Sequence, residues 1–235
     1  MAFFDFLAEM DLYEDSPTSI SRMNARHEFL IAPFRNEIRD ARVFDIASHD
    51  GRWAYAFADA GAKEVVGVEA RPELIAEFEG FPDASLRGSV TLLCNDLFEE
   101  LDQQAARGET YDVVGVFGIF YHVMDHFRLL KAVQALKPRL VLVDGEFIDR
   151  PNPMIQMARE KTGKILNAAP QIDGQEIAVI GIPSFKALEV MADVLGYDVD
   201  WVDWNELPRE ERTGVQDYYR TSGMRRGTCA LRPRA

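Results

Sequence analysis

The sequence predicts an α/β fold built on a doubly wound parallel sheet. Two observations lead to this prediction: apolar, strand-like runs alternate with segments of helical periodicity from residue 43 onward, and the strand ends repeatedly carry polar residues. Parallel neighbours in a sheet need crossover connections, which this alternation supplies. At 235 residues, the chain has the length of one large domain with a substantial core.

The unit from Val43 to Glu69 is the centre of this prediction. An apolar strand ends in a turn at residues 47–51, a helix with apolar positions at helical spacing follows, and Gly61 ends the helix. A second apolar strand ends in Glu69, so the turn and the acid are expected at the same edge of the sheet. Such a turn presents backbone N–H groups, and such an acid can accept hydrogen bonds from two ribose hydroxyls. The unit therefore predicts a nucleoside site.

The rest of the chain continues the alternation. Helices are expected at residues 18–39, 71–79, 98–106 and 184–195 and after His122 as far as residue 135, and strands at residues 89–94, 111–117, 140–143, 197–202 and 227–232. Residues 1–40 are expected to form an N-terminal helical extension, and residues 41–235 are expected to form the domain with the sheet. Within that domain, residues 147–183 are rich in Pro and Gly and are expected to form an insertion over the strand ends.

Charge and cysteine content restrict the function. The net charge of −13 argues against a broad phosphate-binding surface, so nucleic acid is disfavoured and a small-molecule substrate is expected. Cys94 and Cys229 have neither metal-site spacing nor a disulfide framework, and both are expected to be reduced structural residues. The N-terminus is acidic and no apolar run reaches ~18 residues, so neither a secretion signal nor a membrane span is expected. A cytoplasmic enzyme is the resulting prediction.

Two segments have open interpretations. Arg22, Arg26 and His27 would either edge a substrate pocket or solvate the outer face of the first long helix. The insertion at residues 147–183 would either close over the substrate as a lid or form the surface of a homodimer.

The ordered strand ends resemble the class I S-adenosylmethionine-dependent methyltransferases over residues 40 to 232. The resemblance consists of seven strands, a glycine turn after the first, an acid after the second and Asn-Asp after the third. The family's first turn reads Asp/Glu-x-Gly-x-Gly-x-Gly, whereas here Ala47 and His49 stand at two of the glycine positions. The segment Gly115 to Leu130 is similar to the GxLYHxxD pattern of a branch with sugar and other small-molecule O-methyltransferases and wobble-uridine-modifying tRNA enzymes.

The resemblance implies a Rossmann-like methyltransferase sheet and S-adenosylmethionine as the cofactor. Asp45 would approach the amino acid end of the cofactor, Glu69 would bind the ribose, and Asp96 would accept from the adenine amino group. Glu69 and Asp96 also have structural interpretations, as a solvated acid and as a helix cap. His49 would either contact the ligand or be a simple loop residue. The full implied cofactor set is Asp45, Ala47, His49, Gly51, Glu69, Asn95, Asp96, Leu97, Phe117 and Gly118.

Methyl transfer to a hydroxyl needs a base that takes the hydroxyl proton. His122 is the predicted base, because the resemblance places it near the transferred methyl and imidazole titrates near neutral pH; a structural histidine is the alternative. Asp144 and Glu146 end the fifth strand. They would orient His122, bind substrate hydroxyls, or hold a Mg²⁺ ion through their oxygens.

The predicted function is O-methylation of a small-molecule hydroxyl, with a saccharide as the class that the resemblance implies. One alternative is a tRNA-modifying methyltransferase, for which Arg220, Arg225 and Arg226 would supply a local basic strip. The other alternative is a non-catalytic cofactor-binding protein that serves as a partner subunit.

Overall fold

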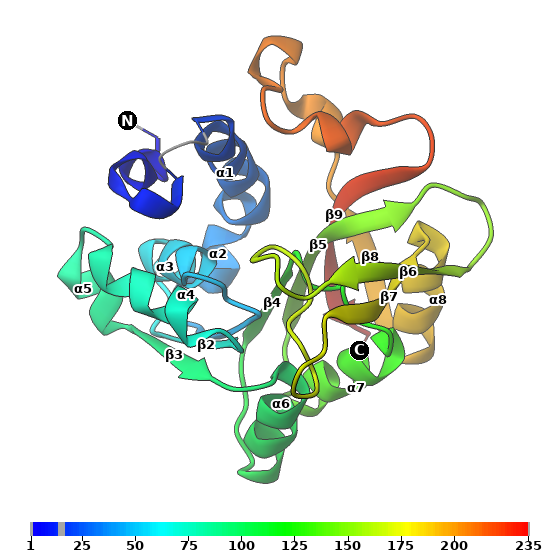
Figure 1. Cartoon of the computed structure of the whole chain (residues 1–235), viewed down its shortest axis with the longest axis horizontal. Helices are drawn as coiled ribbons and strands as arrows, with labels where there is room; N and C mark the ends of the chain where they lie inside the picture. Colours follow the sequence, from blue (N-terminus) through cyan, green and yellow to red (C-terminus); the bar gives the residue numbers. More distant parts are fainter. Residues whose placement is uncertain (1, 14–16, 235) are drawn as a thin grey trace.

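A central sheet of seven strands organises residues 2–13 and 17–234, which the computed structural model describes. The strand order is β3-β2-β1-β4-β5-β9-β8, and β9 runs antiparallel to both of its neighbours, β5 and β8, whereas the other pairs are parallel (Figure 1). The predicted doubly wound sheet is therefore confirmed. The strands are β1 (Arg42–Ile46), β2 (Glu64–Glu69), β3 (Val90–Cys94), β4 (Val113–Phe117), β5 (Leu140–Ile148), β8 (Tyr197–Trp201) and β9 (Met224–Pro233).

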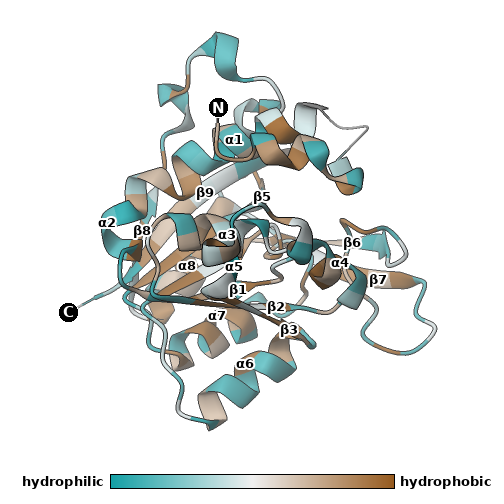
Figure 2. Cartoon of the chain, turned by 90° about the vertical axis from the view of Figure 1, so that its left-hand side faces the viewer, coloured by the Kyte–Doolittle hydropathy of each residue, from teal (hydrophilic) through white to brown (hydrophobic). Residues whose placement is uncertain are grey.

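Helices cover both faces of the sheet, because alternate residues of each central strand point to opposite sides. In β1, Val43 belongs to one core cluster, whereas Phe44 and Ile46 belong to the other. The first face is covered by α1 (Pro17–Leu30), α2 (Arg35–Ile38), α3 (Arg52–Asp59), α4 (Pro72–Glu77) and α5 (Ala84–Gly88), and the second by α6 (Leu97–Ala106), α7 (His126–Ala135) and α8 (Phe185–Val194). Figure 2 shows hydrophilic residues on the outer side of helices such as α6.

Short 3₁₀ turns lie between or beside these larger elements. They are η1 (Asp5–Glu9), η2 (Asp11–Tyr13), η3 (Ala32–Phe34), η4 (Phe78–Gly80), η5 (Trp204–Glu206), η6 (Arg209–Glu211) and η7 (Gln216–Tyr219). In the described part of the chain, no helix combines the length and the apolar character that crossing a membrane requires. Cys94 and Cys229 are both free, as predicted.

Several predicted boundaries were wrong for local reasons. The helix expected at residues 18–39 is divided into α1, η3 and α2, with Pro33 at the break. The helix expected directly after His122 begins only at His126, because Asp125 caps it by accepting from the Arg128 N–H. Residues 118–125 are consequently a loop at the end of β4.

The insertion contains a hairpin that the sequence reading did not predict. Strands β6 (Ile155–Lys161) and β7 (Ile177–Pro183) pair in an antiparallel manner and form a separate small sheet. Ala178, Ile180 and Ile182 are buried on its inner face against Ile148 of β5, which itself extends five residues past its predicted end. On the outer face, Met157 is 66% exposed.

The hairpin docks on the loop before α7 through Gly181. The N–H of Gly181 donates to the carbonyl of Val123 at 3.0 Å, and His126 Nε2 lies 2.9 Å from the carbonyl oxygen of Gly181. A β-carbon at this position would lie 2.7 Å from His126 Cε1 and 2.9 Å from Ile155 Cγ2. The docking therefore requires a residue without a side chain.

We expect Gly181→Ala to weaken the docking of the hairpin by about 1–3 kcal/mol, the usual effect of overpacking a tight contact. The measurement is hydrogen exchange of the amides in residues 155–183 relative to those of β1 and β4. Gly163→Ala in the same insertion is the matched control, since a β-carbon there would meet no atom within 4 Å. Equal exchange in the two variants would contradict the role of Gly181.

Candidate functional site

The turn after β1 has a left-handed backbone at three alternate positions. The φ angles are 55° at Ala47, 56° at His49 and 81° at Gly51. This conformation costs a residue with a β-carbon roughly 1–2 kcal/mol. The turn thus keeps the backbone form that glycines would favour, although glycine occupies only the last position.

Hydrogen bonds to the neighbouring strand hold this turn in place. The N–H of Ser48 donates to the carbonyl of Val68 at 2.9 Å, and the N–H of His49 donates to Glu69 Oε2 at 3.0 Å. At Gly51, a β-carbon would lie 2.5 Å from Phe78 Cδ2, so this glycine is required for packing as well as for its φ angle.

A buried ion pair fixes the other side of the turn. Asp50 is fully buried and accepts from Arg52 Nε at 2.6 Å and from the hydroxyl of Tyr13. Burial would raise the pKa of Asp50, but Arg52 and the contact with His49 lower it well below its usual value. His49 contacts Arg52 through Nδ1, whereas its Nε2 has no partner among the described residues. The contact of His49 with a ligand remains a prediction.

Glu69 is oriented by two backbone donors. The N–H groups of His49 and Arg71 each bind one carboxylate oxygen at 3.0 Å, and the side chain is 7% exposed. Each oxygen keeps a further lone pair, because an ionised carboxylate offers about four acceptor positions. This geometry fits the two hydroxyls of a ribose.

Arg71 joins the end of β2 to the insertion. Its Nη2 donates to the main-chain oxygens of residues 162, 164 and 167 at 3.1, 3.3 and 3.1 Å. A cavity of about 500 Å³ lies here, lined by residues 70–73 and by residues of the 162–170 loop. The insertion therefore covers the edge of the sheet next to Glu69.

Asp45 lies beneath the turn with one oxygen available. It is 1% exposed, and its Oδ2 has no hydrogen-bond partner among the described residues. Burial raises the pKa of Asp45 to about 8, against smaller opposing effects of the Ala54 N–H and Arg52. A buried carboxyl group with a free oxygen fits an ammonium group, which would favour its ionised form.

The end of β3 carries a helix cap. Asp96 Oδ1 accepts from the N–H groups of Phe98 and Glu99 at 2.8 and 3.2 Å, which confirms the helix-cap interpretation. Asn95 donates to Glu100 at 2.9 Å, and Leu97 packs against the second core cluster. Contact of these residues with adenine remains a prediction.

The end of β4 brings Phe117, Gly118 and His122 to the same edge. Phe117 is buried and stacks on Phe57, and Gly118 has a φ of 79° while its N–H donates to the carbonyl of Asp144 at 2.8 Å. In the loop that follows, His122 Nδ1 lies 2.7 Å from Glu160 Oε2. Glu160 belongs to β6.

Glu160, and not Asp144 or Glu146, orients His122, so the predicted partners were wrong. The same oxygen of Glu160 accepts from the N–H of Ala168 at 2.8 Å. Burial would raise the pKa of Glu160, but these two hydrogen bonds lower it. A strand signal in residues 177–183, which are rich in β-branched residues, could have indicated the hairpin that carries Glu160.

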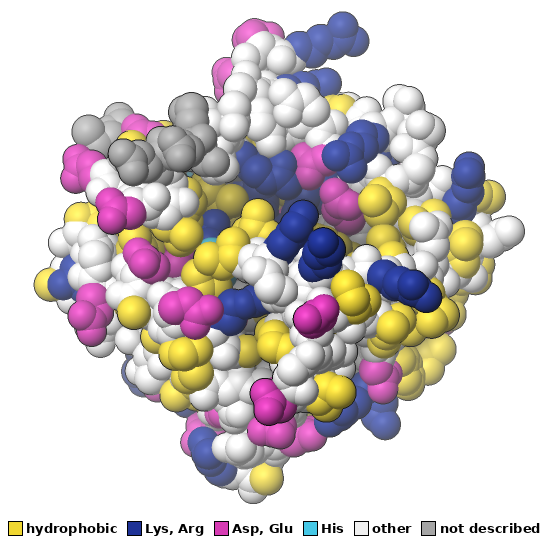
Figure 3. Space-filling view, viewed as in Figure 1, with side chains coloured by type: hydrophobic (Ala, Val, Ile, Leu, Met, Phe, Trp, Pro, Cys, Tyr) yellow, Lys and Arg dark blue, Asp and Glu magenta, His cyan; other side chains and the backbone are white. Residues whose placement is uncertain are grey.

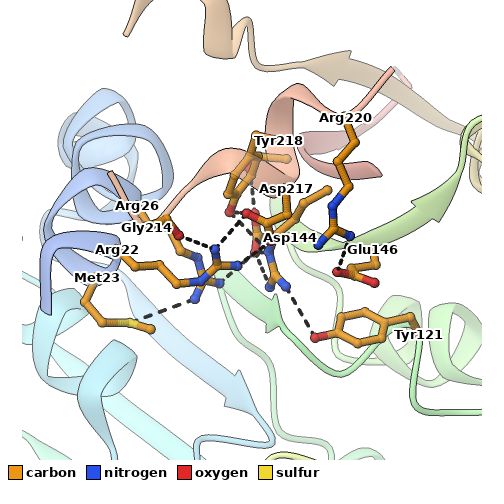
Figure 4. Close-up of polar contacts among 12 residues, drawn as sticks. Arg22, Met23, Arg26, Tyr121, Asp144, Glu146, Gly214, Asp217, Tyr218 and Arg220 are labelled. Carbon is orange, nitrogen blue, oxygen red and sulfur yellow. Dashed lines mark hydrogen bonds and ion pairs between the residues drawn. The ribbon is translucent and has the colours of Figure 1, made fainter. Parts of the chain in front are cut away.

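Asp144 is instead the centre of a buried ion cluster (Figure 4). Its Oδ1 accepts from Arg26 Nη2 at 2.6 Å and from Arg226 Nη2 at 2.6 Å. Its Oδ2 accepts from the hydroxyls of Tyr218 and Thr228 at 2.6 and 2.7 Å. Burial would raise the pKa of Asp144, but the two guanidinium groups lower it well below its usual value.

These contacts do not fit the predicted Mg²⁺ site. Both oxygens of Asp144 are occupied by cationic or hydroxyl donors, and Glu146 lies 3.4 Å from Arg220. Over residues 2–13 and 17–234, no group of three or more His, Cys, Asp or Glu side chains is arranged to hold a metal ion. Arg26 and His27 are buried, so the expectation of a solvated helix face is wrong for both.

No family model matches the chain. The tRNA U34 carboxymethyltransferase of Cellvibrio japonicus is 30% identical over 115 residues, which cover 46% of this chain and 33% of that protein. The protein of the same name from Campylobacter hominis is 27% identical over 145 residues, covering 59% and 47%. The matches thus span less than half the length of these curated relatives.

Solved structures give broader coverage. The N-terminal domain of EvdMO1 with SAH bound is similar with a TM-score of 0.66 and 17% identity, covering 91% of this chain and 81% of that one. The chain has the class I methyltransferase fold. The glycopeptide N-methyltransferase MtfA shares this fold with a TM-score of 0.57 and 14% identity, covering 91% and 90%. One neighbour of this fold is thus named as an N-methyltransferase, so the fold alone does not imply a hydroxyl acceptor.

The raised pKa of Asp45 predicts a specific dependence of stability on pH. The folded-state pKa of about 8 lies above the usual value of 3.8, so the folded protein keeps a proton that the unfolded chain releases between these values. The free energy of unfolding should therefore fall with rising pH from about 4 to 8, by up to about 1.4 kcal/mol per pH unit, relative to Asp45→Asn. Urea unfolding of both proteins without ligand, at several pH values, measures the difference. A difference that is constant with pH would contradict the assignment.

Proposed function

We propose that the protein is an S-adenosylmethionine-dependent methyltransferase that methylates a hydroxyl of a small molecule, with a saccharide as the preferred class. One observation carries the cofactor assignment: the left-handed turn at residues 47–51 faces Glu69, whose carboxylate is oriented by the N–H groups of His49 and Arg71. The SAH bound to the EvdMO1 domain supports the same cofactor class.

Each cofactor group would meet a matching side chain. Glu69 would accept from the ribose hydroxyls through its remaining lone pairs. Asp45 would face the ammonium group through Oδ2, and Asp96 would accept from adenine through the oxygen that does not cap α6. S-adenosylmethionine supplies an electrophilic methyl group, so the protein must supply a positioned hydroxyl and a base.

His122 and Glu160 would form the basic pair. With the Nδ1–H of His122 donating to the carboxylate of Glu160, the lone pair of the ring lies on Nε2. That nitrogen would accept the proton of the acceptor hydroxyl, and Glu160 would stabilise the resulting imidazolium. Because Glu160 lies on β6, the pair forms only while the hairpin is docked.

The saccharide preference is supported by the YHxxD segment and by a structural neighbour. The EvdMO1 domain was also solved in the presence of SAH and D-fucose, and it covers 94% of this chain with a TM-score of 0.66. The contacts that dock the insertion support its interpretation as a lid that excludes water from the site. The exposed apolar residues of its outer face, including Met157 and Val179, support a homodimer surface.

Modification of tRNA is the second candidate, because the curated relatives carry that activity in their names. Arg159, Lys161 and Lys164 of the insertion are exposed and have no ion pair with any described residue. The basic strip predicted at Arg220, Arg225 and Arg226, however, forms ion pairs within the protein. Arg226 is buried against Asp144, and Arg225 lies 3.5 Å from Asp149. A salt titration of tRNA binding separates the candidates, because an RNA enzyme would lose affinity steeply with salt.

We expect Glu69→Ala to weaken the binding of S-adenosylhomocysteine about 100-fold, because two hydrogen bonds to a charged acceptor are lost. Calorimetry measures both affinities. Glu79→Ala is the matched control, since Glu79 is an exposed acid in the same region of the chain. Equal affinities of Glu69→Ala and wild type would remove the ribose role of Glu69. Tight binding without product from any acceptor would favour the partner-subunit alternative.

We expect Glu160→Gln to keep the Nδ1–H tautomer of His122, because the Gln carbonyl oxygen can accept from that N–H, but to remove the negative charge that would stabilise the imidazolium. The affinity for S-adenosylhomocysteine should stay within about twofold. Nitrogen-15 NMR of the imidazole rings reports the tautomer, and the chain has four histidines, so single replacements assign the signals. Once a methyl acceptor has been identified, the kcat of Glu160→Gln should be roughly 10–100-fold lower than that of the wild type. Glu176→Gln, an exposed glutamate before β7, is the control. A neutral ring that is unprotonated at Nδ1 in the wild-type protein would argue against the pair.

A further inference from the structure

Three arginines converge beside the ends of β4 and β5. Arg22 and Arg26 come from α1, and Arg226 comes from β9. Figure 4 shows the two α1 side chains on one side of Asp144 and Tyr121 on the other. We call these three arginines, with Asp144 and Asp217, the arginine recess. Figure 3 shows Lys and Arg side chains, with Asp and Glu side chains beside them, in a hollow of this face.

The arginine recess holds one more positive charge than its carboxylates neutralise. Arg22 forms a two-point pair with Asp217, with both N–O distances at 2.7 Å. Arg26 and Arg226 share the single carboxylate of Asp144. Burial would lower the pKa of Arg226, but Asp144 raises it well above its usual value, so this side chain is cationic.

This excess charge lies out of water. Arg26 and Arg226 are each 5% exposed. A buried charge without a counter-ion is strongly destabilising, and buried ions are ordinarily paired. On a chain of net charge −13, a buried cationic excess at the sheet edge indicates a site for an anion.

A free donor supports the same conclusion. The Nε of Arg26 is buried and has no hydrogen-bond partner in residues 2–13 and 17–234. The Nη1 of Arg226 has the hydroxyl of Tyr121 at 3.3 Å. More than nine in ten buried polar groups in proteins are paired, so the unpaired N–H marks a position for an acceptor from a ligand.

The arginine recess adjoins the proposed base. A β-carbon on Gly118 would lie 3.8 Å from Arg226 Nη2. The ring of Tyr121, whose hydroxyl meets Arg226, has its centroid 4.2 Å from that of His122. A group bound by Arg26 and Arg226 would therefore lie on the acceptor side of the site, at the carboxyl ends of the strands.

We propose that the arginine recess binds an anionic group, a carboxylate or a phosphate, that the methyl acceptor carries. This inference rests on the proposed function and narrows its substrate class to sugar acids, sugar phosphates and similar small anions. The planar guanidinium fork matches both oxyanions. One excess charge suits a single anion, whereas a nucleic-acid strand would need a row of cations.

The test uses the full-length protein saturated with S-adenosylhomocysteine, with sodium acetate and inorganic phosphate as probes at constant ionic strength. We expect at least one probe to shift the NMR signal of the Arg26 Nε–H with millimolar affinity. Arg26→Lys keeps the charge but removes this donor, and it should weaken probe binding about tenfold. Arg232→Lys, which lies in the exposed pairs with Glu37 and Asp200, is the control.

The cofactor's own carboxylate is the competing occupant, and the same protein distinguishes it. If it fills the arginine recess, S-adenosylhomocysteine abolishes probe binding, and Arg26→Lys weakens S-adenosylhomocysteine but not methylthioadenosine, which lacks the carboxylate. That result, or no response to either probe at 50 mM, overturns the proposal. If Arg26→Lys does not fold, Tyr121→Phe replaces it, with the same expected direction.

Failure of the proposed function gives a different result. The protein would then show no affinity for S-adenosylhomocysteine, while probe binding at Arg26 persists in its absence. In that case the anion site stands, but its assignment to a methyl acceptor is overturned.

Discussion

The buried carboxylate of Asp144 holds together segments from the two ends of the chain. Arg26 lies 118 positions before it and Arg226 lies 82 positions after it, and both donate to the same oxygen. Tyr218 and Thr228 bind the other oxygen. Removal of the Asp144 carboxylate would leave two buried arginines without their shared counter-ion, at a cost of roughly 3–5 kcal/mol. The position of α1 over the sheet edge, and with it the shape of the acceptor side, depends on this cluster.

The insertion is attached to the segments that follow β2 and β4. Arg71, after β2, binds its loop through main-chain oxygens, whereas His122 and His126, after β4, bind Glu160 and Gly181 of the hairpin. One segment therefore covers both the ribose side and the acceptor side of the site. The backbone N–H of Arg71 also orients Glu69, so the same residue contributes to the nucleoside site and to the cover above it.

The seven strands and their polar ends can be predicted from sequence, because apolar runs, turn residues and strand ends are local signals. Side-chain partners in the site cannot be predicted in this way. Asp144 was expected beside His122, but its oxygens bind arginines that lie far away in sequence. Glu160 was missed because it stands in three consecutive charged residues, Arg159 to Lys161, which do not show the alternating pattern of a half-buried strand.

The first turn separates a backbone shape from the residue type that usually marks it. Ala47 and His49 adopt φ angles of 55° and 56°, held by Glu69 and by the Arg52–Asp50 pair, so contacts enforce what glycine would merely permit. No family model matches the chain, yet the chain has the fold of solved methyltransferases. Related proteins are therefore better identified by the backbone torsion angles of this turn, and by the residues that contact it, than by the spacing of glycines in the sequence.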